Sequence, residues 1–152
     1  MTAKNHTRTI LAGVALVVGA AALLATGADH LYEYVAEGFS TVPTIGTLFL
    51  LNFIAATLVG VALLLPLRRL AKRLADPLRA LLALSGIGMA ALSLIALWIS
   101  ESSSLFGFTD SGFRSTIVVA IVAESIAVVA LTAYLALADV RVAHPQMRLR
   151  TH

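Results

Sequence analysis

The chain alternates between long uninterrupted apolar runs and short polar segments. Four runs, at residues 9–27, 47–67, 80–100 and 116–138, are long enough to predict helices that cross a bilayer. A hydrocarbon core about 30 Å thick needs about 20 apolar residues at a rise of 1.5 Å per residue, so each run supplies one crossing. Because the connecting segments are short, we expect residues 1–152 to form one membrane domain, an all-α bundle of four transmembrane helices.

The distribution of basic residues predicts the orientation of this bundle. Ten of the eleven lysines and arginines lie before the first run, between the second and third runs, or after the fourth. The opposite side carries Arg114 and most of the acids. Since cytoplasmic loops retain lysine and arginine, we expect both termini in the cytoplasm and a multi-pass protein of the cell inner (plasma) membrane. The net charge of +3 then reflects contact with anionic lipid, and no nucleic-acid partner is expected.

The composition also indicates a membrane protein and excludes several kinds of chemistry. With 59% apolar and 12% charged residues, the chain departs strongly from a soluble domain, in which about a quarter of residues are charged. It contains no cysteine, which excludes disulfides, thiolate metal sites and a cysteine nucleophile. The sequence also lacks a P-loop, a dinucleotide fingerprint and an H-E-x-x-H motif. We therefore expect no cofactor and no catalytic residues.

The connection between the second and third runs combines basic residues with leucines. After Pro66, this pattern predicts a short amphipathic stretch that contacts lipid headgroups. Asp76 and Pro77 then predict the start of the third helix, with Asp76 as N-cap and proline at the first helical position. The expected headgroup-binding residues are Arg68, Arg69, Lys72 and Arg73.

The first run has an alternative interpretation as a secretory signal. It follows basic residues and ends in small residues at 25–28. Its apolar stretch is longer than the roughly 7 to 15 residues of a signal core, which favours a retained helix. Cleavage would leave three spans in the same orientation.

Small and polar residues recur at helical spacing within each run and predict the faces that pack together. Helices in lipid associate through small residues that allow close approach and through polar contacts between helices. The expected inward faces are Ala15 and Gly19 in the first run, Asn52, Ala56 and Gly60 in the second, Gly86, Ala90 and Ser93 in the third, and Ala120, Ala123 and Ala127 around Glu124 in the fourth.

Glu124 is the one acid inside a predicted span. Such a residue costs about 2.5 to 3.5 kcal/mol to insert and usually faces the bundle interior or water. From the outer ends of their spans, Glu124 lies roughly 12 Å deep, Ser93 roughly 10 Å and Asn52 roughly 8 Å. We therefore expect an intramembrane polar cluster of Glu124, Asn52 and Ser93.

Two interpretations of this cluster remain open. Glu124 could accept a proton or cation in a pocket that opens to the outside, or it could only hold helices together by hydrogen bonds. In the first case, residues of the outer segments would lie at the mouth of the pocket. These are His30, Tyr32, Glu33, Asp110 and Arg114. His30, Glu33 and Glu37 share one helical face, but a single histidine among surface acids is a weak metal signal, and no metal site is predicted.

Parts of the chain resemble a known group of proteins. Residues 30–34 leading into 42–52, and residues 105–114 together with Glu124, are similar to uncharacterised small four-helix membrane proteins of actinobacteria. The similarity extends from the end of the first span to the fourth. It implies the four-helix architecture and no particular activity.

These observations predict a small integral membrane protein whose role is that of a non-catalytic accessory, partner-binding or oligomeric component. One alternative is a proton- or cation-linked transporter or channel that uses Glu124; because four helices enclose a narrow pore poorly, it requires a homo-oligomer or larger complex. A second alternative is a membrane-embedded sensor or enzyme. The expected partners are the lipid bilayer and other membrane-embedded subunits.

Overall fold

The structure is a computed structural model that describes residues 3–103 and 115–138. Its membrane-length helices are α1 (Ala3–Val35), α2 (Ile45–Leu64), α4 (Ala75–Ser102) and α5 (Ser115–Leu137). The shorter elements are η1 (Phe39–Thr41), α3 (Leu67–Ala71) and η2 (Lys72–Leu74). The described residues form no strand, and four helices are long and apolar enough to cross a membrane. The predicted all-α architecture with four such helices is confirmed.

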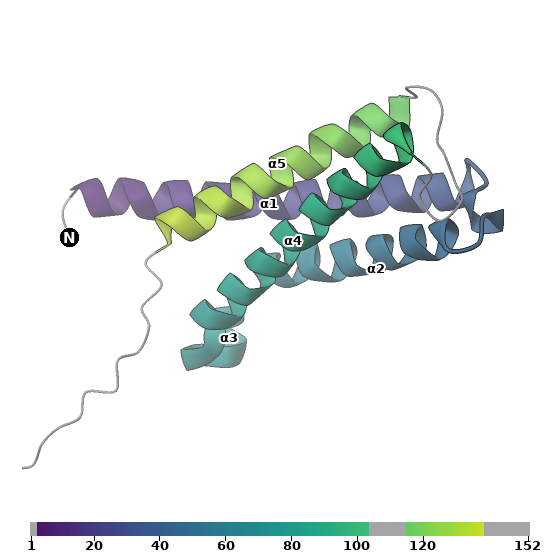
Figure 1. The fold of residues 1–152 in the computed structure, drawn as a ribbon. Helices are drawn as coiled ribbons and strands as arrows, with labels where there is room; N and C mark the ends of the chain where they lie inside the picture. Colours follow the sequence, from purple (N-terminus) through teal and green to yellow (C-terminus); the bar gives the residue numbers. More distant parts are fainter. Residues whose placement is uncertain (1–2, 104–114, 139–152) are drawn as a thin grey trace, which may run out of the picture.

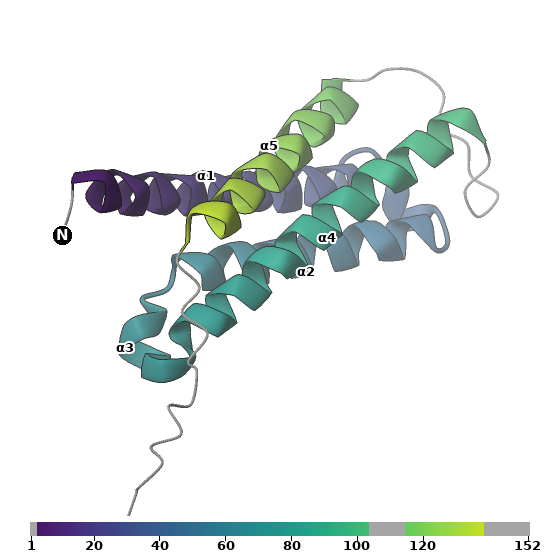
Figure 2. The same ribbon diagram turned by 60° about the vertical axis from the view of Figure 1, so that its left-hand side comes forward.

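Consecutive long helices run in opposite directions (Figure 1). α1 lies between α2 and α5 and packs along both of them. α4 crosses the bundle obliquely and packs against α5 and α2, whereas it touches α1 only briefly (Figure 2). The start of α1 and the α2–α3 connection lie at one end, called the basic end here, and η1 lies at the opposite end. The candidate site is lined by residues of all four long helices.

Glycine and alanine allow the helices to approach closely. Leu131 of α5 is fully buried and lies against two glycines, Gly19 of α1 and Gly86 of α4. A Cβ atom at Gly19 would lie 2.5 Å from the Leu131 Cδ2 atom, and one at Gly86 would lie 2.9 Å from its Cδ1 atom. The two glycines thus form a hole that receives Leu131. Such small-residue packing holds helices together in lipid, where the hydrophobic effect gives no drive for association.

Large apolar side chains point away from the bundle on every long helix. Examples on α1, α2, α4 and α5 are Val17, Leu58, Leu81 and Val129, of which Val129 is 69% exposed. An outer surface of this kind is costly in water and suits the hydrocarbon core of a bilayer. The inward faces predicted from small residues include the fully buried Ala56, Ala90 and Ala127.

The helices do not end at the limits of the apolar runs, and one predicted cap is wrong. α1 continues beyond residue 27 to Val35, because residues 28–35 contain no proline or glycine to end it. The prediction that Asp76 caps α4 is wrong: η2 leads directly into α4, whose N-cap is Leu74, with no side-chain cap bond. Asp76 lies instead in the first turn, where a carboxylate is stabilised by the helix dipole, and pairs with Arg68. Pro77 is tolerated there because the first-turn N–H groups have no intrahelical acceptor.

Candidate functional site

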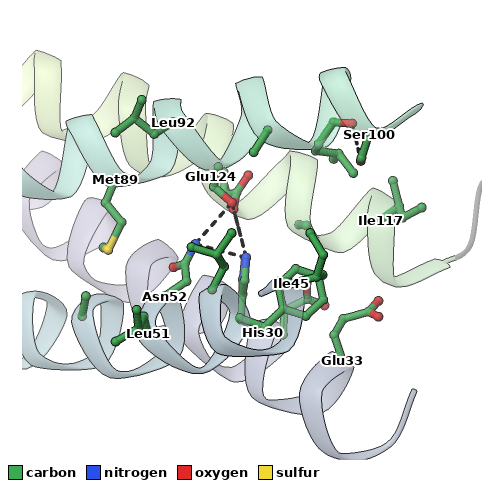
Figure 3. Close-up of a pocket in the computed structure, with 18 of the residues that line it drawn as sticks. His30, Glu33, Ile45, Leu51, Asn52, Met89, Leu92, Ser100, Ile117 and Glu124 are labelled. Carbon is green, nitrogen blue, oxygen red and sulfur yellow. Dashed lines mark hydrogen bonds and ion pairs between the residues drawn. The ribbon is translucent and has the colours of Figure 1, made fainter. Parts of the chain in front are cut away.

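One polar residue from each long helix meets inside the bundle. These are His30 of α1, Asn52 of α2, Ser93 of α4 and Glu124 of α5, referred to below as the polar cluster (Figure 3). The Asn52 Nδ2 atom lies 3.1 Å from His30 Nε2 and 3.3 Å from Ser93 Oγ, and Ser93 Oγ lies 3.3 Å from His30 Nε2. His30 Nε2 is also 3.9 Å from Glu124 Oε1. The cluster therefore connects all four helices at one level.

The contacts of His30 match a neutral ring that carries its hydrogen on Nδ1. Its Nδ1 atom lies 2.9 Å from the carbonyl oxygen of Thr26, which can only accept, so Nδ1 carries a hydrogen. Its Nε2 atom faces the Asn52 amide nitrogen, which can only donate, so Nε2 offers a lone pair. His30 is thus neutral in this arrangement. The Phe49 ring packs edge-on against it at 5.2 Å between centroids and helps to hold its orientation.

Glu124 is buried near the Ser93 hydroxyl group, but its carboxyl oxygens complete no hydrogen bond within the described chain. Glu124 is 1% exposed, and neither of its carboxyl oxygens has a hydrogen-bond partner among residues 3–103 and 115–138. The distance of 3.9 Å to His30 is too long for a hydrogen bond, and the neutral Nε2 atom has no hydrogen to give. The Asn52 Oδ1 atom is similarly buried without a partner in this part of the chain. The polar cluster therefore has more acceptors than donors.

A cavity of about 660 Å³ adjoins the polar cluster. Its volume is in the usual range for a small-molecule site. Asp29 and Glu33 line it beside the four cluster residues, and no lysine or arginine lines it in the described chain. The remaining lining is mostly apolar and comes from α2, α4 and α5. Its rim includes three exposed leucines, Leu48, Leu51 and Leu92, so the cavity borders the surface that faces lipid.

The structure places the predicted mouth residues in different surroundings. His30 belongs to the polar cluster rather than to a mouth above it, and Glu33 is buried and lines the cavity. Tyr32 is 51% exposed and does not line the cavity, because a helix turns its side chain about 200° away from that of His30 over two residues. Asp110 and Arg114 lie outside the described residues.

The role of His30 in the cluster could have been found from the helical period. Gly19, Leu23, Thr26 and His30 follow one another at spacings of four, three and four residues, and all are buried. Extending the first helix past residue 27 therefore carries the inward stripe to His30. The signal was the lack of a helix-breaking residue after Gly27.

A metal ion does not fit the geometry of this site well. The described residues contain no group of three histidine, cysteine or acidic side chains that could hold one. Glu37 follows the end of α1, so it does not continue a helical face with His30 and Glu33.

The predicted headgroup-binding stretch forms α3 and η2 at the basic end. Arg68 lies 3.2 Å from the Asp76 carboxylate, and both side chains are exposed to a large extent. This pairing reduces the contribution of Arg68 to the positive surface. Arg69, Lys72 and Arg73 are exposed, and so are the neighbouring Leu70 and Leu74. The mixture of exposed bases and leucines suits the boundary between headgroups and acyl chains.

Comparisons with protein-family models, curated proteins and solved structures give no match to this chain. The resemblance to small actinobacterial membrane proteins therefore stays a prediction. Any assignment of function depends on the chemistry of the cavity itself.

Proposed function

We propose that this chain is a multi-pass plasma-membrane protein that binds a small amphiphilic molecule in the intramembrane cavity. It acts as a non-catalytic binding component, either alone or as an accessory subunit of a membrane complex. The observation that carries this proposal is the buried carboxyl group of Glu124, which adjoins a cavity of about 660 Å³ and completes no hydrogen bond in the described chain.

A purely structural role for Glu124 explains these contacts less well. Polar residues that hold membrane helices together do so by completing hydrogen bonds between helices, at about 0.6 kcal/mol each. Asn52 makes such contacts to α1 and α4, whereas both Glu124 oxygens lack them in this part of the chain. A buried group without a partner costs about 1 to 3 kcal/mol, more if it is charged. A bound molecule with hydrogen-bond donors would remove that cost.

The rim of the cavity supports entry from the bilayer. Leu51 is 56% exposed and Leu92 is 68% exposed, and they lie on different helices, α2 and α4. Gly88 of α4 also lines the cavity, and nothing lies within 4 Å of the position of its missing Cβ atom. An amphiphile could therefore pass its apolar part between α2 and α4 while its polar part reaches the cluster.

The positions of charged residues support cytoplasmic termini. Arg8 at the start of α1 donates to the carbonyl oxygens of Leu137 and Ala136 at the end of α5, which joins both helix ends at the basic end. The exposed bases of α3 and η2 lie at this end as well. Cytoplasmic loops are enriched in such residues, so we place the basic end in the cytoplasm.

Binding of a neutral probe tests the proposal. Phenylbutanol has an apolar body and one hydroxyl group, and its binding to protein in lipid nanodiscs can be measured by equilibrium dialysis, with empty nanodiscs as the measure of lipid partition. Gly88→Leu places a side chain in the rim of the cavity and should reduce binding at least roughly tenfold.

Gly13→Leu is the matched control, because Gly13 also has open space at its Cβ position but does not line the cavity. It should bind phenylbutanol as the wild type does. Equal binding by empty and protein-containing nanodiscs, or equal effects of the two substitutions, would contradict the proposal.

Proton-linked transport is a second candidate function, favoured by the proximity of His30 and Glu124. The lone pair of His30 Nε2 faces the carboxyl group at 3.9 Å, so the pair can hold one proton in either of two places. In proteoliposomes that contain a pH-sensitive dye, the wild type should dissipate an imposed pH gradient faster than Glu124→Gln. This role also requires an oligomer, so a strict monomer in mild detergent would count against it.

A further inference from the structure

The geometry points to a lipophilic primary amine as the ligand, with its ammonium group at the polar cluster and its apolar body along the rim formed by α2 and α4. This inference rests on the proposed function and adds the chemical class of the ligand to it. It depends on hydrogen-bond inventory, on charge and on the shape of the cavity.

The buried acceptor atoms of the polar cluster require a ligand that donates hydrogen bonds. The His30 Nδ1 hydrogen is used by the Thr26 carbonyl, and the Asn52 amide nitrogen donates to His30 and Ser93. The remaining donor, the Ser93 hydroxyl group, lies 3.3 Å from the lone pair of His30 Nε2 and can donate there. Three buried acceptor atoms are left without a donor in the described chain: Glu124 Oε1, Glu124 Oε2 and Asn52 Oδ1. A primary ammonium group carries three donors and no acceptor, which matches this inventory in kind and in number.

Charge favours a cation over a neutral donor such as an alcohol. Asp29 and Glu124 line the cavity, and His30, the one basic side chain on its wall among residues 3–103 and 115–138, is neutral in its present contacts. α2 and α4 contribute no titratable side chain to this lining. A charged carboxylate in a membrane interior is stabilised most by a counter-charge that also donates hydrogen bonds. An anionic ligand would be repelled from the same place.

The shape of the cavity favours an organic cation over an inorganic one. Its volume of about 660 Å³ far exceeds what a bare ion occupies, and the described residues offer no cluster of three metal-ligating side chains. Most of the wall beyond the cluster is apolar, with Leu48, Leu51, Met89 and Leu92 between the cluster and the lipid-facing surface. Apolar surface buried there stabilises a hydrocarbon or aromatic tail through close packing.

Three probes with one carbon skeleton test the inference: phenylbutylamine, phenylbutanol and phenylbutyrate, which are cationic, neutral and anionic at neutral pH. Binding to wild-type protein in nanodiscs of uncharged lipid is measured as described for the alcohol, with partition into empty nanodiscs subtracted for each probe. The amine should bind roughly tenfold more tightly than the alcohol, as expected for charge-assisted hydrogen bonds, and phenylbutyrate should bind most weakly.

The variant Glu124→Gln tests whether the Glu124 carboxyl group causes the preference for the amine. It should lower the ratio of amine to alcohol affinity to about one, while measurable binding of the alcohol shows that the cavity still forms. Gly13→Leu, far from the cavity lining, should leave the ratio at its wild-type value.

The outcomes separate this inference from the proposed function. Equal affinities of the amine and the alcohol for the wild type, or tightest binding of phenylbutyrate, would overturn the amine assignment and leave a cavity that binds amphiphiles. A full amine preference in Glu124→Gln would overturn the role of Glu124 in it. Failure of every probe to bind beyond lipid partition would overturn the proposed function together with the inference. If Glu124→Gln does not fold, the three affinities of the wild type still decide the ligand class.

Discussion

Replacing Gly19 by alanine should destabilise the bundle, whereas the same replacement at Gly13 on the same helix should not. At Gly19 the new Cβ atom would lie 2.5 Å from Leu131 Cδ2, 2.7 Å from its Cγ and 3.3 Å from its backbone nitrogen. Movement of the side-chain tip alone cannot relieve the contacts to Cγ and the backbone, so α1 and α5 must separate slightly. At Gly13 nothing lies within 4 Å of the new atom.

The magnitude follows from two opposing contributions. Overpacking of a tight contact costs about 1 to 3 kcal/mol. Alanine is favoured over glycine within a helix by up to about 1 kcal/mol, and this gain applies at both positions. Since the helix contribution cancels in the comparison, the free energy of unfolding of Gly19→Ala should be lower than that of Gly13→Ala by about 1 to 3 kcal/mol.

A second substitution tests whether the contact with Leu131 causes the loss of stability in Gly19→Ala. Leu131→Ala opens a cavity at a fully buried position and should itself cost about 2 kcal/mol, near the lower end of the usual range, because unfolded membrane helices remain solvated by detergent. In that background the contacts to Cγ and Cδ2 are removed and only the contact of 3.3 Å to the backbone nitrogen remains. The penalty of Gly19→Ala relative to Gly13→Ala should then shrink, giving a coupling free energy of at least about 1 kcal/mol.

The assay is reversible unfolding in mixed micelles with increasing dodecyl sulfate. Because the natural chain has no cysteine, two cysteines introduced at exposed positions of α1 and α5 can carry a dye pair that reports separation of these helices. Equal stabilities of Gly19→Ala and Gly13→Ala, within about 0.5 kcal/mol, would refute the packing argument. Strict additivity of Gly19→Ala and Leu131→Ala would do the same.

Three further predictions follow from other contacts. Phenylbutylamine binding should weaken as the pH falls, because protonation of Glu124 removes the counter-charge and protonation of His30 adds a repelling one. The measurement is the affinity at several pH values, and the affinity of phenylbutanol should not change over the same range. Arg8→Ala removes the donors to the terminal carbonyl oxygens of α5 and should lower the free energy of unfolding by about 1 kcal/mol or less, as measured in the dodecyl sulfate titration. In intact cells, an impermeant maleimide should label Ser40→Cys, which follows α1 at the end opposite the bases, but not Lys4→Cys; the reverse pattern would contradict cytoplasmic termini.

Much of the helical architecture was predictable because lipid imposes simple requirements. A helix that crosses a bilayer must satisfy its own backbone groups and present apolar side chains over about 20 residues, and both properties can be recognised in the sequence. Small residues at helical spacing similarly predicted inward faces, and Ala56, Ala90 and Ala127 are fully buried. The start of α4 was not predictable in this way, because η2 joins it without the cap that Asp76 suggested.

Four apolar helices of membrane length, one of them containing Glu124, can be recognised in the amino-acid sequence. The groups that surround the Glu124 carboxyl group depend on how the helices pack. Residues of all four long helices line the cavity, and the continuation of α1 to Val35 brings His30 beside Asn52 and Ser93. The physical reason is that helix formation depends on local sequence and the solvent, whereas crossing angles depend on how side chains such as Leu131 fit glycines on other helices.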